Sequence, residues 1–216
     1  MKILFEDNHL LVVEKPINVP MQADESNDAD LLSLGKAYLK EKYQKPGNVY
    51  LGLVHRLDRP VGGVVVFAKT SKAASRLSES IRTDQMIKTY EAVVVGNLPQ
   101  HSTLIDYLTK DEKTNTSTVT DARRGKYCEL SWALIRSSGP LHHLRINLKT
   151  GRSHQIRVQF AARGCPLWGD QRYNSQTKPG QQLALWATSL SFPHPITQSL
   201  CTFTSPIPHQ LPWTNL

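Results

Sequence analysis

The sequence contains few cysteines. Of its 216 residues only Cys128, Cys165 and Cys201 are cysteines, and they lie far apart in the chain. An odd number of widely spaced cysteines fits neither a disulfide framework nor a CxxC metal site. We therefore predict reduced thiols and a cytoplasmic protein.

Long hydrophobic runs are also missing. No apolar stretch approaches the roughly 20 residues that a membrane-spanning helix requires. The N-terminus reaches the acidic residues Glu6 and Asp7 too early for a secretory signal. With 39% hydrophobic and 20% charged residues, the composition is that of a globular protein. The length favours a single domain over residues 1–216.

Several families of catalytic motif are absent from the sequence. The eight histidines show no HExxH spacing, and no GxxxxGK[ST] or GxGxxG motif occurs. A Ser-His pair stands at Ser153 and His154, but no nucleophile elbow accompanies it. The two basic motifs described below supply only one acid, whereas glycosidase chemistry needs two. The sequence therefore predicts no metal site and no nucleotide cofactor.

Positive charge is in excess. The chain has 26 lysines and arginines against 18 aspartates and glutamates, which gives a net charge of +8. This excess favours a polyanionic partner, and nucleic acid is the commonest one in a cytoplasm. A basic surface that only keeps the protein soluble is the alternative, and charge alone leaves it open.

Apolar periodicity predicts an alternation of strands and helices. Two helices are expected. The first runs from Asp30 to about Tyr43 and can be capped by Asp28 or Asp30, and the second runs to about Arg82 and can be capped by Thr70 or Ser71. Residues 109–121 are polar and predicted to form a surface loop or a weak hairpin. The predicted strands cover residues 3–5, 10–13, 49–54, 64–68, 88–95, 127–135, 142–148 and 183–187. The strands at 3–5 and 10–13 are predicted to form a β-hairpin. The short connection between the strands at 127–135 and 142–148 indicates that these two pair antiparallel.

The first motif that needs explaining is His55-Arg56-Leu57-Asp58-Arg59-Pro60, which lies between two apolar runs. Pro60 fixes its own φ and restricts Arg59, so Asp58 is expected on a stiff segment. Arg56 and Arg59 would favour the ionised form of Asp58 if they lie close to it. The alternative is a solvated loop of surface ion pairs.

The second motif is Thr150-Gly151-Arg152-Ser153-His154-Gln155-Ile156-Arg157. Ser153 is a suitable N-cap for a short helix that ends near Gly164. Arg152, His154 and Arg157 then converge on the start of this helix, where backbone N–H groups attract anions. The motif therefore predicts an anion or carboxylate site. A solvated basic helix face is the alternative.

Taken together, these motifs resemble the RluA-type pseudouridine synthases, which isomerise uridine in ribosomal or transfer RNA. The resemblance rests on the two motifs above, on Lys88-Thr89-Tyr90, on Glu14-Lys15-Pro16 and on the stretch from Pro166 to Tyr173. It follows the family's order over nearly the whole chain. It implies an α+β fold with a mixed, mostly antiparallel central sheet, flanking helices and a basic catalytic cleft.

The resemblance also implies roles for single residues. Asp58 resembles the catalytic aspartate that attacks the target nucleotide, Arg157 the arginine that pairs with it, and Tyr90 the tyrosine packed against the flipped base. Arg56 resembles the arginine that fills the space left by the base. Further contacts with RNA are expected from Arg59, Arg152, His154 and Lys15. No cofactor is implied, because breaking the glycosidic bond, turning the base and rejoining it consumes nothing.

The expected partner is a stem-loop of rRNA or tRNA, bound by a monomer without an additional N-terminal RNA-binding domain. Two other functions stay open: a catalytically silent RNA-binding module and an aspartate-dependent hydrolase of another anionic substrate. The chain departs from the family pattern at Gly62 in the loop after Asp58, at Asn18 where glycine is frequent, and at Trp186 where histidine is common. Asn18 is predicted to adopt a left-handed conformation.

Overall fold

The computed structural model describes residues 1–216, except for the side chain of Asn215. The chain forms two compact units. The first unit contains residues 1–87 and 187–206, and the second contains residues 88–186 and 207–216. Both consist of mostly antiparallel strands with helices packed against them, which confirms the predicted α+β class.

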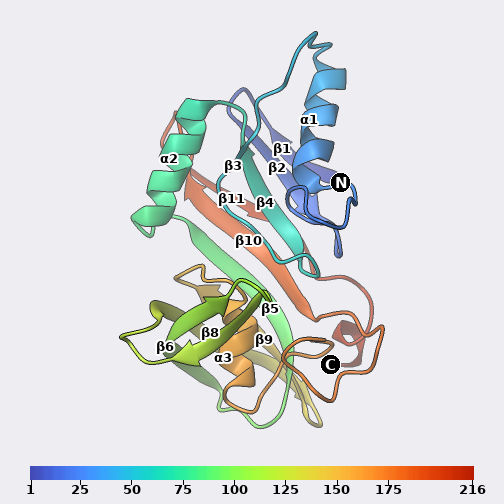
Figure 1. Cartoon of the computed structure of the whole chain (residues 1–216), viewed down its shortest axis with the longest axis vertical. Helices are drawn as coiled ribbons and strands as arrows, with labels where there is room; N and C mark the ends of the chain where they lie inside the picture. Colours follow the sequence, from blue (N-terminus) through green and yellow to red (C-terminus); the bar gives the residue numbers. More distant parts are fainter. The chain divides into compact units, whose positions relative to one another are not determined.

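The strands of the first unit follow the order β1-β2-β4-β10, with β3 paired to β4 and β11 paired to β10 (Figure 1). The pairs β1–β2, β2–β4, β3–β4 and β10–β11 are antiparallel. Their bounds are β1 (Lys2–Glu6), β2 (Leu10–Lys15), β3 (Gly52–Leu53), β4 (Gly62–Ala68), β10 (Leu185–Pro193) and β11 (Leu200–Thr204). The predicted hairpin at the N-terminus is confirmed by the β1–β2 pair.

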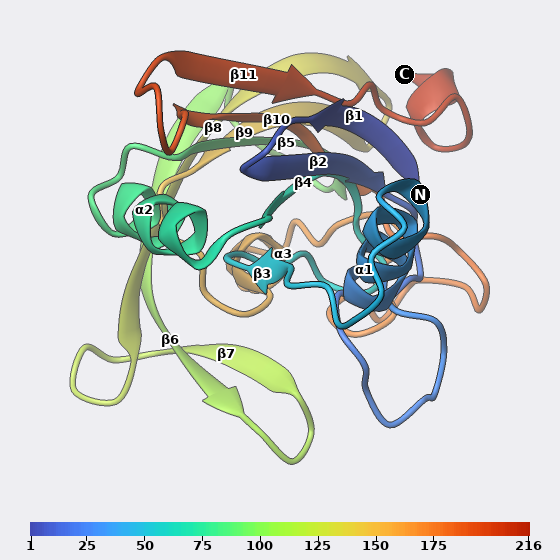
Figure 2. The same ribbon diagram turned by 90° about the horizontal axis from the view of Figure 1, so that it is seen from above.

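Two helices, α1 (Leu31–Lys42) and α2 (Ser71–Arg82), lie on the same side of β2 and β4 (Figure 2). Each begins with the predicted cap, because the side chain of Asp30 accepts from the N–H of Ser33 and that of Thr70 from the N–H of Ala73. Capping of this kind satisfies backbone donors that the first turn leaves unpaired. The apolar core under α2 includes Leu10, Val12, Val64, Val66, Ala73, Leu77 and Phe192.

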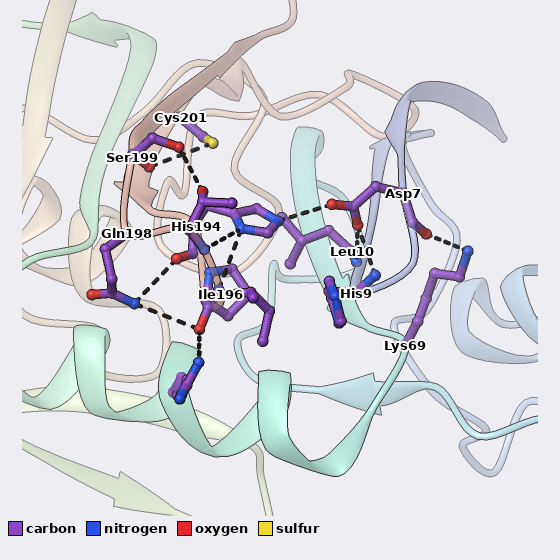
Figure 3. A network of polar contacts seen from close by, with 12 residues as sticks. Asp7, His9, Leu10, Lys69, His194, Ile196, Gln198, Ser199 and Cys201 are labelled. Atoms are coloured by element: carbon purple, nitrogen blue, oxygen red, sulfur yellow. Dashed lines mark hydrogen bonds and ion pairs between the residues drawn. The ribbon is translucent and has the colours of Figure 1, made fainter.

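A polar network joins the turn after β1 to the turn after β10 in the same unit (Figure 3). The Nε2 of His194 lies 2.9 Å from Oδ2 of Asp7, and its Nδ1 accepts from the N–H groups of Ile196 and Thr197. Oδ1 of Asp7 in turn accepts from the N–H groups of His9 and Leu10, both at 2.7 Å. Since Nδ1 is an acceptor, Nε2 carries the proton that it donates to Asp7.

The strands of the second unit follow the order β5-β9-β8-β6-β7, and all four of these pairs are antiparallel. Their bounds are β5 (Ile87–Val95), β6 (His101–Asp111), β7 (Thr116–Thr120), β8 (Lys126–Ser138) and β9 (Leu141–Leu148). Helix α3 (Gln155–Ala161) contacts β6 and β7 and sets Phe160 against Trp132 of β8, with ring centroids 6.0 Å apart. The β6–β7 pair confirms a hairpin within residues 109–121, and β6 itself was not predicted.

Two local predictions were wrong. Residues 49–54 were expected to form a buried strand, but only Gly52–Leu53 are paired, although Val49 and Leu51 are buried. Ser153 was expected to cap α3, but the residue preceding the helix is His154, with φ 54° and no side-chain capping bond. Apolar side chains predict burial, whereas a strand also needs a neighbour with which to pair. No described helix is long and apolar enough to cross a membrane.

Candidate functional site

The Asp58 motif forms the loop between β3 and β4 in the first unit. Leu57, 6% exposed, anchors the loop in the core, and the N–H of Val61 donates to the carbonyl of Asp58 at 3.0 Å. The Nε2 of His55 accepts from the N–H of Val66 on β4 at 3.1 Å. Asp58 is half-buried and is the first residue of this turn, whose central residues are Arg59 and Pro60.

The side chain of Lys15, at the end of β2, donates hydrogen bonds to the backbone of this loop. Its side chain is fully buried, and Nζ donates to the carbonyls of Pro16, Arg59 and Val61 at 3.0, 2.9 and 2.6 Å. Burial lowers the pKa of Lys15 to about 7, an effect that the negative charge of Asp58 opposes. Three carbonyl acceptors match the three donors of an ammonium group. Lys15 is therefore directed at the loop backbone, which differs from the RNA contact expected for it.

Two residues near Lys15 and the Asp58 loop, Gly63 on β4 and Asn18 after β2, adopt positive φ angles. Gly63 has φ 117°, and a Cβ atom there would lie 2.2 Å from the carbonyl oxygen of Ala187. Only glycine fits such a position without moving the backbone. Asn18 has φ 63°, which confirms the predicted left-handed conformation.

The two arginines of the motif are placed differently. Both Arg56 and Arg59 are exposed. The guanidinium of Arg59 donates to Oγ of Ser26 at 2.9 Å and to Asp28, and it lies 3.6 Å from Asp24. Arg59 thus fastens the loop of residues 24–28 beside the Asp58 turn.

In the second unit, Arg157 of α3 forms a buried fork with Asp170. Its Nε and one terminal nitrogen each lie 2.8 Å from a different carboxylate oxygen, and Asp170 is fully buried. Burial alone would raise the pKa of Asp170, but Arg157 and the N–H groups of Arg172 and Tyr173 lower it overall. The Tyr173 ring lies 5.2 Å from the guanidinium carbon. The orientation of Arg157 is therefore fixed by a charged partner and an aromatic face.

The remaining residues of the second motif differ in their exposure to solvent. His154 is 9% exposed and its Nδ1 lies 2.8 Å from the hydroxyl of Tyr173, so it faces the interior rather than solvent. Arg152 is exposed, and its Nε donates to the carbonyl of Tyr127. The Gln155 side chain accepts from Thr150 and from the N–H of Arg152, which shapes the loop before α3.

Tyr90 lies on β5 opposite Ile146 of β9 and is 7% exposed, and Trp186 is 8% exposed. Tyr90 and Arg157 belong to the second unit, and Asp58 to the first. Their convergence on one site stays a prediction. The structure brings together Lys15 with the Asp58 loop, and separately Arg157 with the segment around Asp170.

The ion pair between Asp170 and Arg157 was not predicted from the sequence. The only indication that Asp170 and Tyr173 matter was that both lie in the stretch from Pro166 to Tyr173, which supported the family resemblance. Neither the periodicity nor the spacing of charges indicates that this acid reaches Arg157. In the part of the chain that the structure describes, no cluster of three or more His, Cys, Asp or Glu side chains could hold a metal ion.

Comparison with known proteins identifies the class. The sequence model of the family described as RNA pseudouridylate synthase matches residues 9–162 of this chain. The chain therefore belongs to this family. The chain is 31% identical over 211 residues to an uncharacterized RNA pseudouridine synthase of Bacillus subtilis, covering 96% of this chain and 69% of that protein. It is 30% identical to ribosomal large subunit pseudouridine synthase D of Yersinia pestis, covering 91% of this chain and 64% of that protein.

The fold matches solved structures with the same family name. Human RNA pseudouridylate synthase domain containing 4 has a TM-score of 0.80 at 21% identity, over 96% of this chain and 89% of that chain. Human RNA pseudouridylate synthase domain containing 1 has a TM-score of 0.75 at 21% identity, over 97% of this chain and 84% of that chain. These matches confirm the pseudouridine synthase fold expected from the sequence.

Proposed function

We propose that the chain isomerises a specific uridine of structured RNA to pseudouridine, with residues 1–216 acting as one catalytic domain and without a cofactor. The observation that carries this proposal is the braced Asp58 loop in a member of the pseudouridylate synthase family. The carboxylate of an aspartate can act as a nucleophile that forms a covalent intermediate. A rigid loop holds such a nucleophile in place, which reduces the entropy lost on reaching the transition state.

In this proposal Asp58 attacks the target nucleotide, Tyr90 packs against the extruded base, and Arg157 orients the Asp58 carboxylate. A guanidinium has five N–H donors, and the contact with Asp170 uses two of them. Arg157 can therefore bind a second carboxylate without leaving the first. Asp170 becomes the residue that keeps Arg157 correctly oriented.

RNA binding is assigned to the exposed arginines. Flipping a uridine out of its stack costs a few kcal/mol, which contacts with phosphates and stacking must offset. Arg56, Arg59 and Arg152 are exposed on a chain of net charge +8. Lys15 and His154 are buried, so we assign them to support of the two loops instead.

The relatives named as ribosomal large subunit synthases favour rRNA as the substrate, with tRNA as the second candidate. We keep the expectation of a cytoplasmic monomer that acts on a stem-loop.

The test is a pseudouridine map of RNA from a deletion strain after incubation with the purified protein. We expect the wild type to form pseudouridine at one position, and Asp58→Asn to form none while still binding the RNA. Asp84→Asn is the matched control, because Asp84 is exposed and its φ of 55° is tolerated by asparagine. Product formed by Asp58→Asn would refute the mechanism. RNA binding by a wild type that forms no product would instead favour the catalytically silent module.

A further inference from the structure

A pocket of about 370 Å³ lies beside α1 in the first unit, away from the Asp58 loop in the sequence. Its lining includes the side chains of Lys36 and Lys40 and the segment from Gly47 to Val49. Both lysines are exposed and stand four residues apart, so they lie on the same face of the helix. Two lysines therefore stand on one wall of the pocket, and the segment from Gly47 to Val49 forms the other wall.

The two walls of this pocket are held together by packing. A Cβ atom at Gly35 would lie 2.7 Å from the side chain of Leu51, so α1 and the segment after it are in close contact. Val49 and Leu51 are 8% and 5% exposed and anchor this segment in the core. The pocket is thus a fixed feature of the first unit.

The charge on the pocket wall is not compensated. Among the described residues neither Lys36 nor Lys40 forms an ion pair, whereas Lys42 and Lys69 both pair with Glu6 at 2.7 Å. Like charges four residues apart destabilise a helix. Lysine ammonium groups that are not engaged in ion pairs remain available to contact phosphate oxygens.

We propose that this pocket binds a backbone phosphate of the RNA stem that flanks the target uridine. The Lys36 and Lys40 ammonium groups would neutralise the phosphate, and the Asn48 amide, which is exposed beside them, would donate a hydrogen bond. This proposal rests on the proposed function, since it assumes that RNA is the substrate.

The chain limits which phosphate the pocket binds. Eight residues separate Val49 from Asp58, so the Cα atoms of these two residues lie at most about 30 Å apart. A phosphate in the pocket and a uridine at Asp58 therefore fit on one stem-loop, and we assign the phosphate to the stem beside the modified loop.

The test measures binding and turnover separately. Large-subunit rRNA transcribed in vitro is the probe, and the double variant Lys36→Gln/Lys40→Gln is compared with the wild type. We expect Kd and KM to rise about tenfold with kcat unchanged, because a contact remote from chemistry contributes to ground and transition states equally. The slope of log K against log salt should fall by about one. A tenfold rise in Kd with an unchanged salt slope would overturn the assignment of a phosphate contact.

Gly47 offers a second variant that leaves both lysines in place. Nothing lies within 4 Å of a Cβ atom at Gly47, and its φ is outside the left-handed region, so a side chain is accommodated there. Gly47→Glu would introduce a carboxylate into the pocket and should weaken binding as the double variant does. Gly47→Gln, of the same size, should bind like the wild type. Equal binding by both Gly47 variants would overturn the proposal.

A charge-matched control removes two other exposed lysines, as Lys72→Gln/Lys178→Gln. If this control weakens binding as much as the double variant in α1, the effect is one of net charge and the proposal fails. Binding is measured whether or not product forms, so a wild type that binds RNA without modifying it refutes only the proposed activity. A wild type that does not bind RNA overturns both proposals.

Discussion

Replacing Lys15 by methionine tests whether the buried ammonium group holds the Asp58 loop. Methionine retains an unbranched apolar stem but loses the terminal ammonium group and all three donors to the carbonyls of Pro16, Arg59 and Val61. Hydrogen bonds of charged groups contribute roughly 1.5–3 kcal/mol each, so three together contribute about 5–9 kcal/mol.

Burial of the charge opposes these hydrogen bonds. A pKa lowered from 10.5 to about 7 indicates that burial disfavours the charged form of Lys15 in the folded chain. Because this cost offsets much of the gain from the hydrogen bonds, we expect Lys15→Met to lower the free energy of unfolding by no more than about 2 kcal/mol. Turnover should suffer more, because a displacement of about 1 Å at the reacting group costs about 100-fold in rate.

The pH dependence of stability gives an independent check. Below pH 7 Lys15 is protonated in both the folded and the unfolded chain, so its contribution does not change with pH. Between about pH 7 and 10.5 the unfolded chain retains the proton that the folded chain has lost. The free energy of unfolding of the wild type should therefore rise with pH in this window relative to Lys15→Met.

The assays are urea unfolding followed by tryptophan fluorescence at several pH values, and single-turnover formation of pseudouridine. Lys72→Met, at an exposed position on α2, is the control and should leave both measurements unchanged. A Lys15→Met protein with turnover within about twofold of the wild type would refute the role of Lys15 as a brace for the loop. If the free energy of unfolding changes with pH in the same way for the wild type and for Lys15→Met, the claim that burial lowers the pKa of Lys15 is refuted.

Two further predictions concern other buried charges. Asp170→Asn should lower the free energy of unfolding by about 3–5 kcal/mol, since it leaves Arg157 buried without its carboxylate, and thermal melts beside the Asp84→Asn control would measure this. Equal melting temperatures would contradict it. In the network of Figure 3, burial opposes ionisation of Asp7, but the N–H groups of His9 and Leu10 and the His194 side chain lower its pKa overall. Asp7 therefore stabilises the fold above its unfolded pKa of 3.8, and this stability is lost as pH falls through the lowered native pKa. Below about pH 4 the free energy of unfolding, measured with urea, should fall less steeply with decreasing pH for Asp7→Asn than for the wild type. An equally steep fall for both proteins would contradict this reasoning.

Local features of the fold could be predicted from the sequence because they depend on neighbouring residues. Asp30 and Thr70 begin helices as expected, since a cap and the helix it serves are adjacent in the chain. The left-handed conformation of Asn18 follows from the side chain itself. The order of the motifs was also enough to indicate the family.

Other features depend on residues that are distant in the chain. The strand at 101–111 was missed because its pairing with β7 and β8, rather than its own apolar pattern, makes it a strand. His154 was expected to face RNA, but the hydroxyl of Tyr173, 19 residues later, holds it in the interior.

By itself, the sequence determined the fold class, the helix caps and the two motifs with their charges. Only the tertiary structure decided which partner each charge has. Lys15 binds the carbonyl of Val61, 46 residues away, and Arg157 binds Asp170 across a turn. The physical reason is that a buried charge must be compensated by whichever polar groups the fold brings within hydrogen-bonding distance, and sequence spacing does not encode that distance.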